Sequence, residues 1–259
     1  MYKSFRVGAA MYIYFFNFRR AKQAVLTAAL MAFISFLFWI TVFDQHVETV
    51  STTHSRIIYK VKTDQKVAAL TFDISWGKKI PEPVLDILKK ENLKCTFFLS
   101  GPWAEQHPEI VRRIAAEGHE IASHGHRHVN YSELPNNVIA EEMGKAHEIL
   151  KNLTGRTPNL IRTPNGDWNE RVLDVISGEG YTAVQWSVDS LDWKDIGVER
   201  IVNRVLRLIH PGAIILMHAS DSVEQTPEAL PRIIKGLKEK GYKIVTVAEL
   251  MTCGRGVCE

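Results

Sequence analysis

Apolar runs and amphipathic stretches alternate along the chain from residue 67 onward. The apolar runs are short and rich in aliphatic and aromatic residues, which is typical of strands that are covered on both faces. In the stretches between them, apolar residues recur three and four positions apart, which is typical of helices that bury one face. We predict strands at residues 67–72, 94–99, 120–122, 159–161, 182–188, 213–217 and 243–247.

This order corresponds to about seven β-α units, which predicts an α/β fold with a parallel sheet and helices outside it. Seven units can close into a barrel smaller than the eight-stranded one, and a doubly wound open sheet is the alternative. The sequence contains no Gly-rich phosphate loop, so it gives no support to a nucleotide-binding fold.

The N-terminal part contains one long apolar stretch without a charge, residues 24–43. About 20 apolar residues are needed to span a bilayer as a helix, so this stretch predicts one transmembrane helix. Arg19, Arg20 and Lys22 precede it and Asp44 follows it, which predicts a cytoplasmic N-terminus and an extracytoplasmic remainder. A cleaved signal peptide is the alternative, but the stretch ends in bulky residues rather than at a small-x-small site.

The anchor divides the chain into five predicted segments. Residues 1–23 are cytoplasmic, residues 24–43 are the anchor, residues 44–63 are a polar stem, residues 64–250 are the folded domain and residues 251–259 are a tail. The 259 residues are 46% hydrophobic and 24% charged, which is ordinary for a globular protein with a sizeable core. The net charge of +3 is small and much of the basic excess is N-terminal, so we expect no nucleic-acid partner.

The three cysteines form neither a metal knuckle nor a dense disulfide scaffold. Cys95 lies in an apolar run and is predicted to be a small core residue. Cys253 and Cys258 are close together near the C-terminus, where they could pair in an oxidising compartment or stay free.

Ionisable side chains follow five of the predicted strands, at the point where each strand ends. In parallel α/β folds the carboxyl ends of the strands form the site, so we expect these side chains to surround one site. In strand order they are Asp73, then His124 and His128, then Arg162, then Asp189 and Asp192, and finally His218 with Asp221.

The densest candidate is the tract 123–128, which contains three of the ten histidines. Neutral imidazole is the commonest protein ligand for zinc and related metals. If the tract is a loop after a strand, His124 and His128 can turn towards one ion while His126 faces elsewhere. A hydrophilic surface loop is the alternative interpretation.

These strand-end motifs resemble those of the polysaccharide deacetylases of carbohydrate esterase family 4, the NodB-homology domain, over about residues 64–250. The chain also resembles the membrane-anchored, sporulation-associated branch called PdaB-like. The resemblance implies a distorted (β/α)7 barrel that removes N-acetyl groups from amino sugars with a divalent metal. The residues that match motif positions are Asp73, His124, His128, Arg162, Asn165, Asp192, Trp193, Leu216 and His218.

On the water side, the resemblance implies that Asp73, in the segment 71–73, is the general base and that Arg162 orients it. His124 and His128 would be the metal ligands. Zinc is the first choice of metal, with cobalt and manganese as alternatives. Such a metal would activate a water and polarise the acetyl carbonyl.

On the leaving-group side, the resemblance implies that His218 is the general acid and that Asp192 tunes it. Trp193 would wall the pocket, and Leu216 begins the matching Leu-x-His motif. The backbone N–H of Asn165 would help to hold the oxyanion of the tetrahedral intermediate.

Three positions depart from the family's motifs. The second aspartate of the first motif, normally a metal ligand, is Ile74, and isoleucine cannot coordinate a metal. Gly125 replaces a serine or threonine, and Asn165 replaces an aromatic residue. Asp73 itself and His126 are the candidates to replace the missing ligand.

The sequence therefore predicts a metal-dependent N-deacetylase that acts outside the cell membrane on N-acetylated cell-wall glycan, either peptidoglycan or a chitin-like polymer. The alternative is a non-catalytic or weakly active glycan-binding sporulation protein that has kept the fold, which Ile74 motivates. A covalent serine mechanism has no support because the sequence contains no nucleophile elbow. The sequence does not identify a protein partner.

Overall fold

The computed structural model describes residues 22–23, 26–27, 31 and 57–258. The predicted anchor (24–43) and most of the predicted stem (44–63) lie outside these residues. No helix among the described residues is long and apolar enough to cross a membrane. The chain divides into two compact units, residues 1–53 and 54–259, and every element named below belongs to the second.

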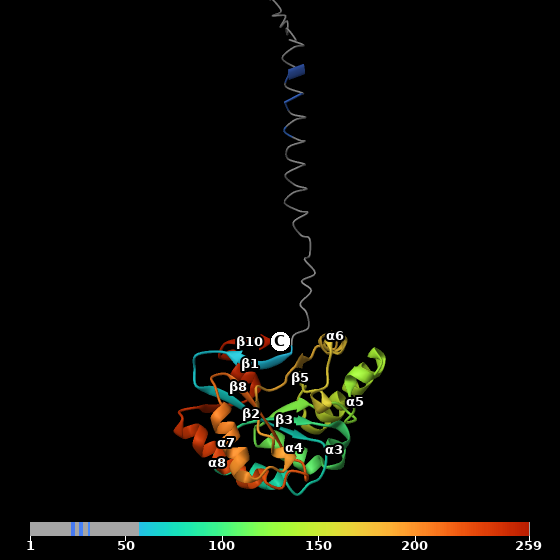
Figure 1. The fold of residues 1–259 in the computed structure, drawn as a ribbon. Helices are drawn as coiled ribbons and strands as arrows, with labels where there is room; N and C mark the ends of the chain where they lie inside the picture. Colours follow the sequence, from blue (N-terminus) through green and yellow to red (C-terminus); the bar gives the residue numbers. More distant parts are fainter. Residues whose placement is uncertain (1–21, 24–25, 28–30, 32–56, 259) are drawn as a thin grey trace, which may run out of the picture. The chain divides into compact units, whose positions relative to one another are not determined.

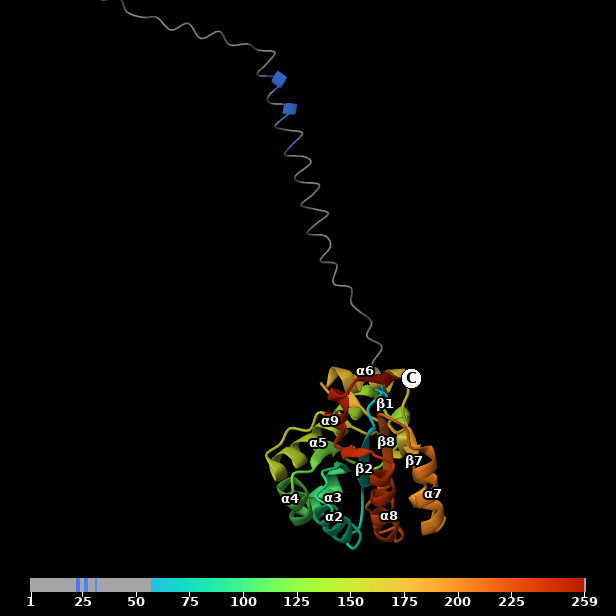
Figure 2. The ribbon, with the colours of Figure 1, turned by 90° about the vertical axis from the view of Figure 1, so that its left-hand side faces the viewer.

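One sheet forms the centre of this unit, and ten of its strands lie in the described part of the chain (Figures 1 and 2). Its order is β10-β1-β8-β2-β3-β4-β5-β6, with β7 beside β8 and β9 beside β2. The strands are β1 (Ile58–Lys62), β2 (Val67–Ile74), β3 (Thr96–Leu99), β4 (Glu120–Ser123), β5 (Leu160–Ile161), β6 (Thr182–Ala183), β7 (Val188–Asp189), β8 (Ala213–His218), β9 (Lys243–Val245) and β10 (Arg255–Cys258).

The strands from β2 to β6 pair in parallel, and so do β7, β8 and β2. Their carboxyl ends therefore meet at one edge, as predicted. The sheet nearly closes on itself, because Ile58 of β1 forms a parallel bridge with Val184, just after β6, while β1 also pairs with β8. The structure thus confirms an α/β fold with a nearly closed, barrel-like sheet.

Helices pack around this sheet, and Figures 1 and 2 show them on its outside. Four of the helices named below, α2, α3, α4 and α8, have proline as their first or second residue, and proline lacks the N–H that the first helical turn leaves without a partner. The helices are α2 (Pro81–Lys90), α3 (Gly101–Gln106), α4 (Pro108–Ala116), α5 (Asn136–Thr154), α6 (Glu170–Gly178), α7 (Val198–Leu208), α8 (Thr226–Glu239) and α9 (Val247–Thr252).

Strand β2 shows how the sheet separates two regions. All eight of its residues are buried, and successive side chains point to opposite faces. Ala68, Leu70, Phe72 and Ile74 belong to the outer core, which contains side chains of α2, α4, α7 and α8. The alternate residues face inward, where Val67 and Ala69 join the inner apolar cluster and Thr71 and Asp73 supply polar groups. The alternation therefore directs Asp73 inward and Ile74 outward.

Several predicted boundaries differ from the structure, and three of these differences affect the fold. The stem was expected to extend to residue 63, but residues 58–62 form β1, because Ile58 and Val61 are buried. The expected tail at 251–259 contains the end of α9 and strand β10, which pairs with β1. The single strand expected at 182–188 is divided into β6 and β7, and between them Val184 forms a bridge with Ile58 of β1.

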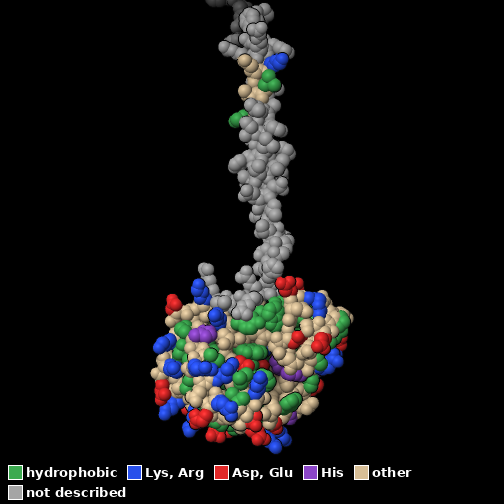
Figure 3. Space-filling model, in the orientation of Figure 1, with side chains coloured by type: hydrophobic (Ala, Val, Ile, Leu, Met, Phe, Trp, Pro, Cys, Tyr) green, Lys and Arg blue, Asp and Glu red, His purple; other side chains and the backbone are tan. Residues whose placement is uncertain are grey.

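Cys95 is fully buried in the outer core, as predicted. The Cys253–Cys258 pairing stays open, because the side chain of Cys258 lies outside the described part of the structure. On the face shown in Figure 3, lysine and arginine side chains are interspersed with aspartate and glutamate side chains.

Candidate active site

A cavity of about 520 Å³ opens where the parallel strands end. Seven of the nine predicted site residues line it, and Arg162 and Asp192 contact two of these from behind. The lining residues are Asp73, Ser75, Trp76, His124, His128, Asn165, Gly166, Trp186, Asp189, Trp193, Leu216, His218, Ser220 and Ser222.

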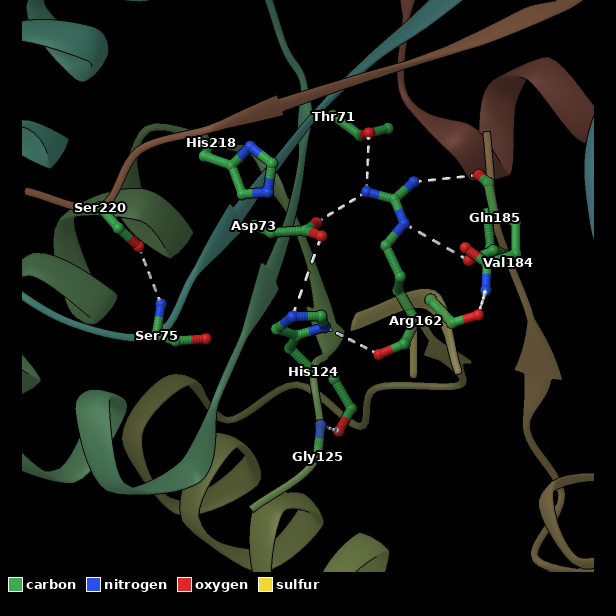
Figure 4. Close-up of polar contacts among 12 residues, drawn as sticks. Thr71, Asp73, Ser75, His124, Gly125, Arg162, Val184, Gln185, His218 and Ser220 are labelled. Atoms are coloured by element: carbon green, nitrogen blue, oxygen red, sulfur yellow. Dashed lines mark hydrogen bonds and ion pairs between the residues drawn. The ribbon is translucent and has the colours of Figure 1, made fainter. Parts of the chain in front are cut away.

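Asp73 and Arg162 form a buried ion pair at the inner wall of the cavity. Nη1 of Arg162 donates to Oδ1 of Asp73 at 2.7 Å (Figure 4). The guanidinium is completely buried, and it also donates to Thr71 Oγ1 and to the backbone carbonyls of Val184 and Gln185. A buried cation needs such a set of partners, because its desolvation is costly. These contacts fix the orientation of the Asp73 carboxylate.

Phe98 lies beneath this pair, with its ring centroid 4.1 Å from Cζ of Arg162. Burial alone would raise the pKa of Asp73, but the positive charge of Arg162 opposes it, with smaller contributions from His124 and His218. The net result is a pKa below the ordinary aspartate value, so Asp73 is a carboxylate at neutral pH.

His218 and Asp192 form a second pair on the other side of Asp73. β2 and β8 are in register with Asp73 beside His218, and Figure 4 shows the His218 ring next to the Asp73 carboxylate. Nδ1–H of His218 donates to Oδ1 of Asp192 at 2.8 Å, and the His218 backbone N–H donates to Oδ2 of the same carboxylate. Thr226 Oγ1 also donates to that oxygen.

These contacts set the charge of His218. Burial alone would lower the pKa of His218, but the hydrogen bond and charge of Asp192 raise it, and so does Asp73. The net shift is upward, which favours the imidazolium. The cavity therefore contains an ionised base in Asp73 beside a potential proton donor in His218.

The histidine tract turns sharply after β4. Gly125 has a φ of +73°, and a Cβ at this position would lie 2.4 Å from the hydroxyl of Tyr131. Glycine avoids both the strain and the clash, which explains the departure from serine or threonine in the motif. The turn brings the rings of His124 and His128 together, with centroids 5.3 Å apart. Both histidines line the cavity.

His124 is in the form that a metal ligand requires. Its Nδ1–H donates to the backbone carbonyl of Arg162 at 2.8 Å, which leaves the lone pair of Nε2 directed into the cavity, 3.9 Å from Oδ2 of Asp73. Burial lowers the pKa of His124 to about 4, and partial burial also lowers the pKa of His128. Two neutral imidazoles therefore fit a divalent cation as ligands.

A third ligand is missing from the described residues, where no group of three metal-ligating side chains occurs. Ile74 holds the motif position of the usual carboxylate, and its side chain belongs to the outer core. His126 does not line the cavity, because its Nδ1 lies over Gly101. Of the two candidates for the third metal ligand, Asp73 therefore remains. Its Oδ1 accepts from Arg162, and its Oδ2 faces His124.

Asn165 and Trp193 also line the cavity. Asn165 has a φ of +58°, a conformation that asparagine tolerates better than an aromatic residue does. Its side chain donates to Asn130 Oδ1, away from the catalytic pairs.

Several residues of the site belong to none of the predicted motifs. Ser75 and Ser220 follow Asp73 and His218 by two positions, and the Ser75 N–H donates to Ser220 Oγ. Their distance of two residues from the predicted base and acid is a signal that could have revealed them. Trp186 and Thr226 gave no such signal. Trp186 lies between β6 and β7, where a single strand was expected, and Thr226 is the first residue of helix α8.

Comparison with known proteins agrees with this architecture. Residues 60–184 match the family model described as Polysaccharide deacetylase. A peptidoglycan-N-acetylglucosamine deacetylase of Bacillus cereus is 39% identical over 184 residues, covering 70% of this chain and 67% of that protein. The protein YlxY of Bacillus subtilis is 36% identical over 194 residues, which cover 75% of this chain and only 60% of YlxY.

A solved structure of a CE4 family pseudoenzyme from Bacillus anthracis superposes with a TM-score of 0.72 at 32% identity, covering 76% of this chain and 69% of that chain. A mutant of the same protein, with restored enzymatic activity, is equally similar, with a TM-score of 0.72 and 33% identity. The chain belongs to the polysaccharide deacetylase family.

Proposed function

We propose that this protein is a hydrolase that removes N-acetyl groups from the amino sugars of cell-wall glycan, either peptidoglycan or a chitin-like polymer. The observation that carries the proposal is the pairing of Asp73 with Arg162 and of His218 with Asp192 around one cavity. An ionised carboxylate next to a potential imidazolium is what amide hydrolysis by general base and general acid requires.

In the reaction that we propose, the Asp73 carboxylate accepts a proton from the attacking water, and Arg162 keeps that carboxylate ionised and oriented. The backbone N–H of Asn165 stabilises the oxyanion of the tetrahedral intermediate. His218 then donates a proton to the sugar nitrogen as the C–N bond breaks. Acetate and a free amino sugar are the products.

His124 and His128 are the residues that would hold a divalent metal, with zinc as the first choice and cobalt or manganese as alternatives. When bound, such a metal lowers the pKa of a water and polarises a carbonyl. The carboxylate that usually completes the set is absent at Ile74, so we expect weaker binding than three protein ligands would give.

The second candidate function is that of a glycan-binding sporulation protein that has kept the fold but has weak catalytic activity or none. The observation that favours it is the outward-facing Ile74, together with the pseudoenzyme among the similar structures. The two candidates differ in one respect, because only the first requires acetate release that depends on Asp73 and His218.

We also propose that residues 24–43 are a single-pass membrane anchor, with the N-terminus in the cytoplasm and the deacetylase domain outside. The charge-free sequence and its basic N-terminal flank support this orientation. The same features support assignment to the membrane-anchored PdaB-like sporulation branch. Protease added to intact protoplasts should degrade the domain, and full protection of the domain would contradict the orientation.

The proposed activity is tested by adding the protein to N-acetylated glucosamine oligomers or peptidoglycan with zinc, cobalt or manganese and measuring acetate. We expect release by the wild type and loss of release in Asp73→Asn and His124→Ala. Growth complementation by a stable His128→Ala/His218→Ala double variant would instead favour the non-catalytic function.

A further inference from the structure

One acidic residue lies in the buried face of helix α5. The buried residues of this helix are Ile139, Glu142, Met143, Ala146 and Leu150. Four of them are apolar, whereas Glu142 is a carboxylate that is only 2% exposed. Glutamate is almost never this buried unless it is paired, because removing a carboxylate from water is costly. The reaction proposed above does not use this carboxylate, so its burial points to another role.

Both carboxylate oxygens of Glu142 accept hydrogen bonds from Arg127, the residue before His128. The Arg127 backbone N–H donates to Oε2 at 2.8 Å, and the Arg127 Nε–H donates to Oε1 at 2.8 Å. A carboxylate acceptor makes such bonds stronger than those between neutral groups. The Arg127 side chain is 57% exposed, so its charge stays in contact with water while the carboxylate is buried. Glu142 therefore binds both the backbone and the side chain of one residue of the histidine tract.

The start of the tract is held without any contribution from Glu142. The His124 N–H donates to the Leu99 carbonyl at 2.9 Å, and the Gly101 N–H donates to the Gly125 carbonyl at 2.9 Å. The His124 ring is buried, and its Nδ1–H donates to the Arg162 carbonyl. The first of the two proposed metal ligands is therefore fixed by both its backbone and its side chain.

The end of the tract depends on Glu142. In the described part of the chain, the hydrogen bonds that join residues 126–128 to another element are the two that Glu142 accepts. His128 is exposed, so packing restrains its ring less than it restrains the buried ring of His124. The bond from the Arg127 N–H to Glu142 is thus the hydrogen bond to another element that lies nearest to His128 in the sequence.

We propose that Glu142 is a positioning residue of the metal site. By accepting the Arg127 N–H, it holds the backbone directly before His128 in place and so keeps the His128 ring beside that of His124. Less of the tract then has to become ordered when a divalent cation binds. This inference rests on the proposed function for the role of His124 and His128 as metal ligands.

The alternative role of Glu142 is that of an ion-pair partner that only stabilises the fold. Replacing a buried ion pair by apolar residues of similar volume is often neutral or stabilising, so stability alone gives little reason for a carboxylate in this face. The two roles also depend on different hydrogen bonds. Positioning depends on the Arg127 N–H, which Arg127→Ala keeps, whereas the ion pair depends on the guanidinium, which Arg127→Ala removes.

The test measures the zinc affinity of the full chain by titration calorimetry. Glu142→Gln keeps the size of the side chain, but its amide NH2 opposes one of the two donors of Arg127. We expect zinc affinity to fall about tenfold, since changes in residues that support metal ligands cost about 10–100-fold. Arg127→Ala should cost less than about threefold, because the backbone N–H remains and an exposed ion pair contributes little. Glu141→Gln, at an exposed position of the same helix that pairs with Lys145, should bind zinc like the wild type.

Hydrogen exchange of the metal-free proteins gives a second measurement, which needs neither zinc nor turnover. The backbone amides of residues 126–128 should exchange faster in Glu142→Gln than in the wild type, while those of the central strand β2 exchange at the same rate. Faster exchange of β2 to the same extent would show that the change destabilises the whole fold, and would favour the ion-pair role.

Equal zinc affinity of the wild type and Glu142→Gln would overturn the inference, and so would an equal loss in Arg127→Ala or a wild type that binds no zinc. These results are distinguishable from failure of the proposed function. Acetate release by the wild type together with zinc affinity that ignores Glu142 removes the positioning role only. Zinc affinity that depends on Glu142, without any acetate release, supports the positioning role and removes the deacetylase activity.

Discussion

Oδ1 of Asp73 lies 2.7 Å from Nη1 of Arg162, and the guanidinium has no exposure to solvent. The two charges are thus buried together at the inner wall of the cavity. Each charge is stable there because the other is present, and the inward alternation of β2 directs the carboxylate to that position.

Replacing Arg162 by alanine should destabilise the fold. The change leaves the Asp73 carboxylate buried without its partner, so we expect the free energy of unfolding to fall by about 3–5 kcal/mol. Urea denaturation measures this change. Arg232→Ala removes a partner of Glu199 on the surface and should change stability by less than about 1 kcal/mol. Equal effects of the two changes would contradict the buried-pair account.

The Asp73–Arg162 pair also predicts how activity depends on pH on the acidic side of the pH profile. The folded-state pKa of Asp73 is lowered, so its stabilising contribution is complete above the unfolded-state value and is lost as pH falls through the folded-state value. Protonation of Asp73 should therefore not limit deacetylation until the pH is below about 4, and above that pH acid unfolding of the rest of the domain sets the limit. Arg162→Lys keeps the charge but loses the fork of donors, and we expect its acid limb to move to higher pH.

Asp192 should determine the pH at which activity is lost on the alkaline side of the pH profile. Activity requires protonated His218, whose folded-state pKa is raised above 6.5, so activity is lost as pH rises through that value. Asp192→Asn removes the main cause of the upward shift, and the alkaline limb should move to lower pH. The pH dependence of kcat/KM measures this shift. Asp189→Asn is the matched control, because Asp189 lines the cavity but accepts from the Leu191 N–H.

Metal binding should depend on two of the three histidines in the tract. Titration calorimetry should show that zinc affinity falls more than about 100-fold in His124→Ala. Removal of a residue that only supports a metal ligand costs up to about 100-fold in affinity, and removal of the ligand itself costs more. His126→Ala should bind like the wild type, because His126 does not line the cavity. If His126→Ala alone abolished binding, the assignment of the ligands would be wrong.

Ile74→Asp should increase zinc affinity and reduce stability without metal. Ile74 is the last residue of β2, at the edge where the cavity opens, so a carboxylate there can turn towards a cation on His124 and His128. Without a cation it stays in the outer core, at a cost of at least about 2 kcal/mol. Ile74→Asn is the matched control, since it is similar in size but a much weaker ligand. We expect zinc to raise the melting temperature of Ile74→Asp more than that of Ile74→Asn. Identical responses to zinc would show that position 74 does not reach the cation.

Much of the fold could be predicted because the apolar pattern follows the packing. The central strands β2, β3 and β8 are buried on both faces and are apolar runs in the sequence, and the helices carry apolar stripes that face the outer core. The closure between Ile58 and Val184 could not be predicted, because β1 lies in a mostly polar stretch and its partner is distant in sequence.

The site was partly predictable for a similar reason. Asp73 is the last residue but one of β2 and His218 ends β8, while His124 and Arg162 directly follow β4 and β5. The topology therefore brings these four residues together. The outward orientation of Ile74 needed the register of β2, and the hydrogen bond of Thr226 to Asp192 joins residues 34 positions apart. Contacts of this kind depend on how helices pack, and no local pattern encodes them.

The most direct measurement is acetate release from N-acetylglucosamine oligomers by the full chain with added zinc, cobalt or manganese, beside Asp73→Asn. The account predicts release by the wild type and a loss of at least about 100-fold in the variant, which lacks the general base. Absence of acetate with all three metals, from folded protein that binds the oligomer, would contradict the deacetylase function.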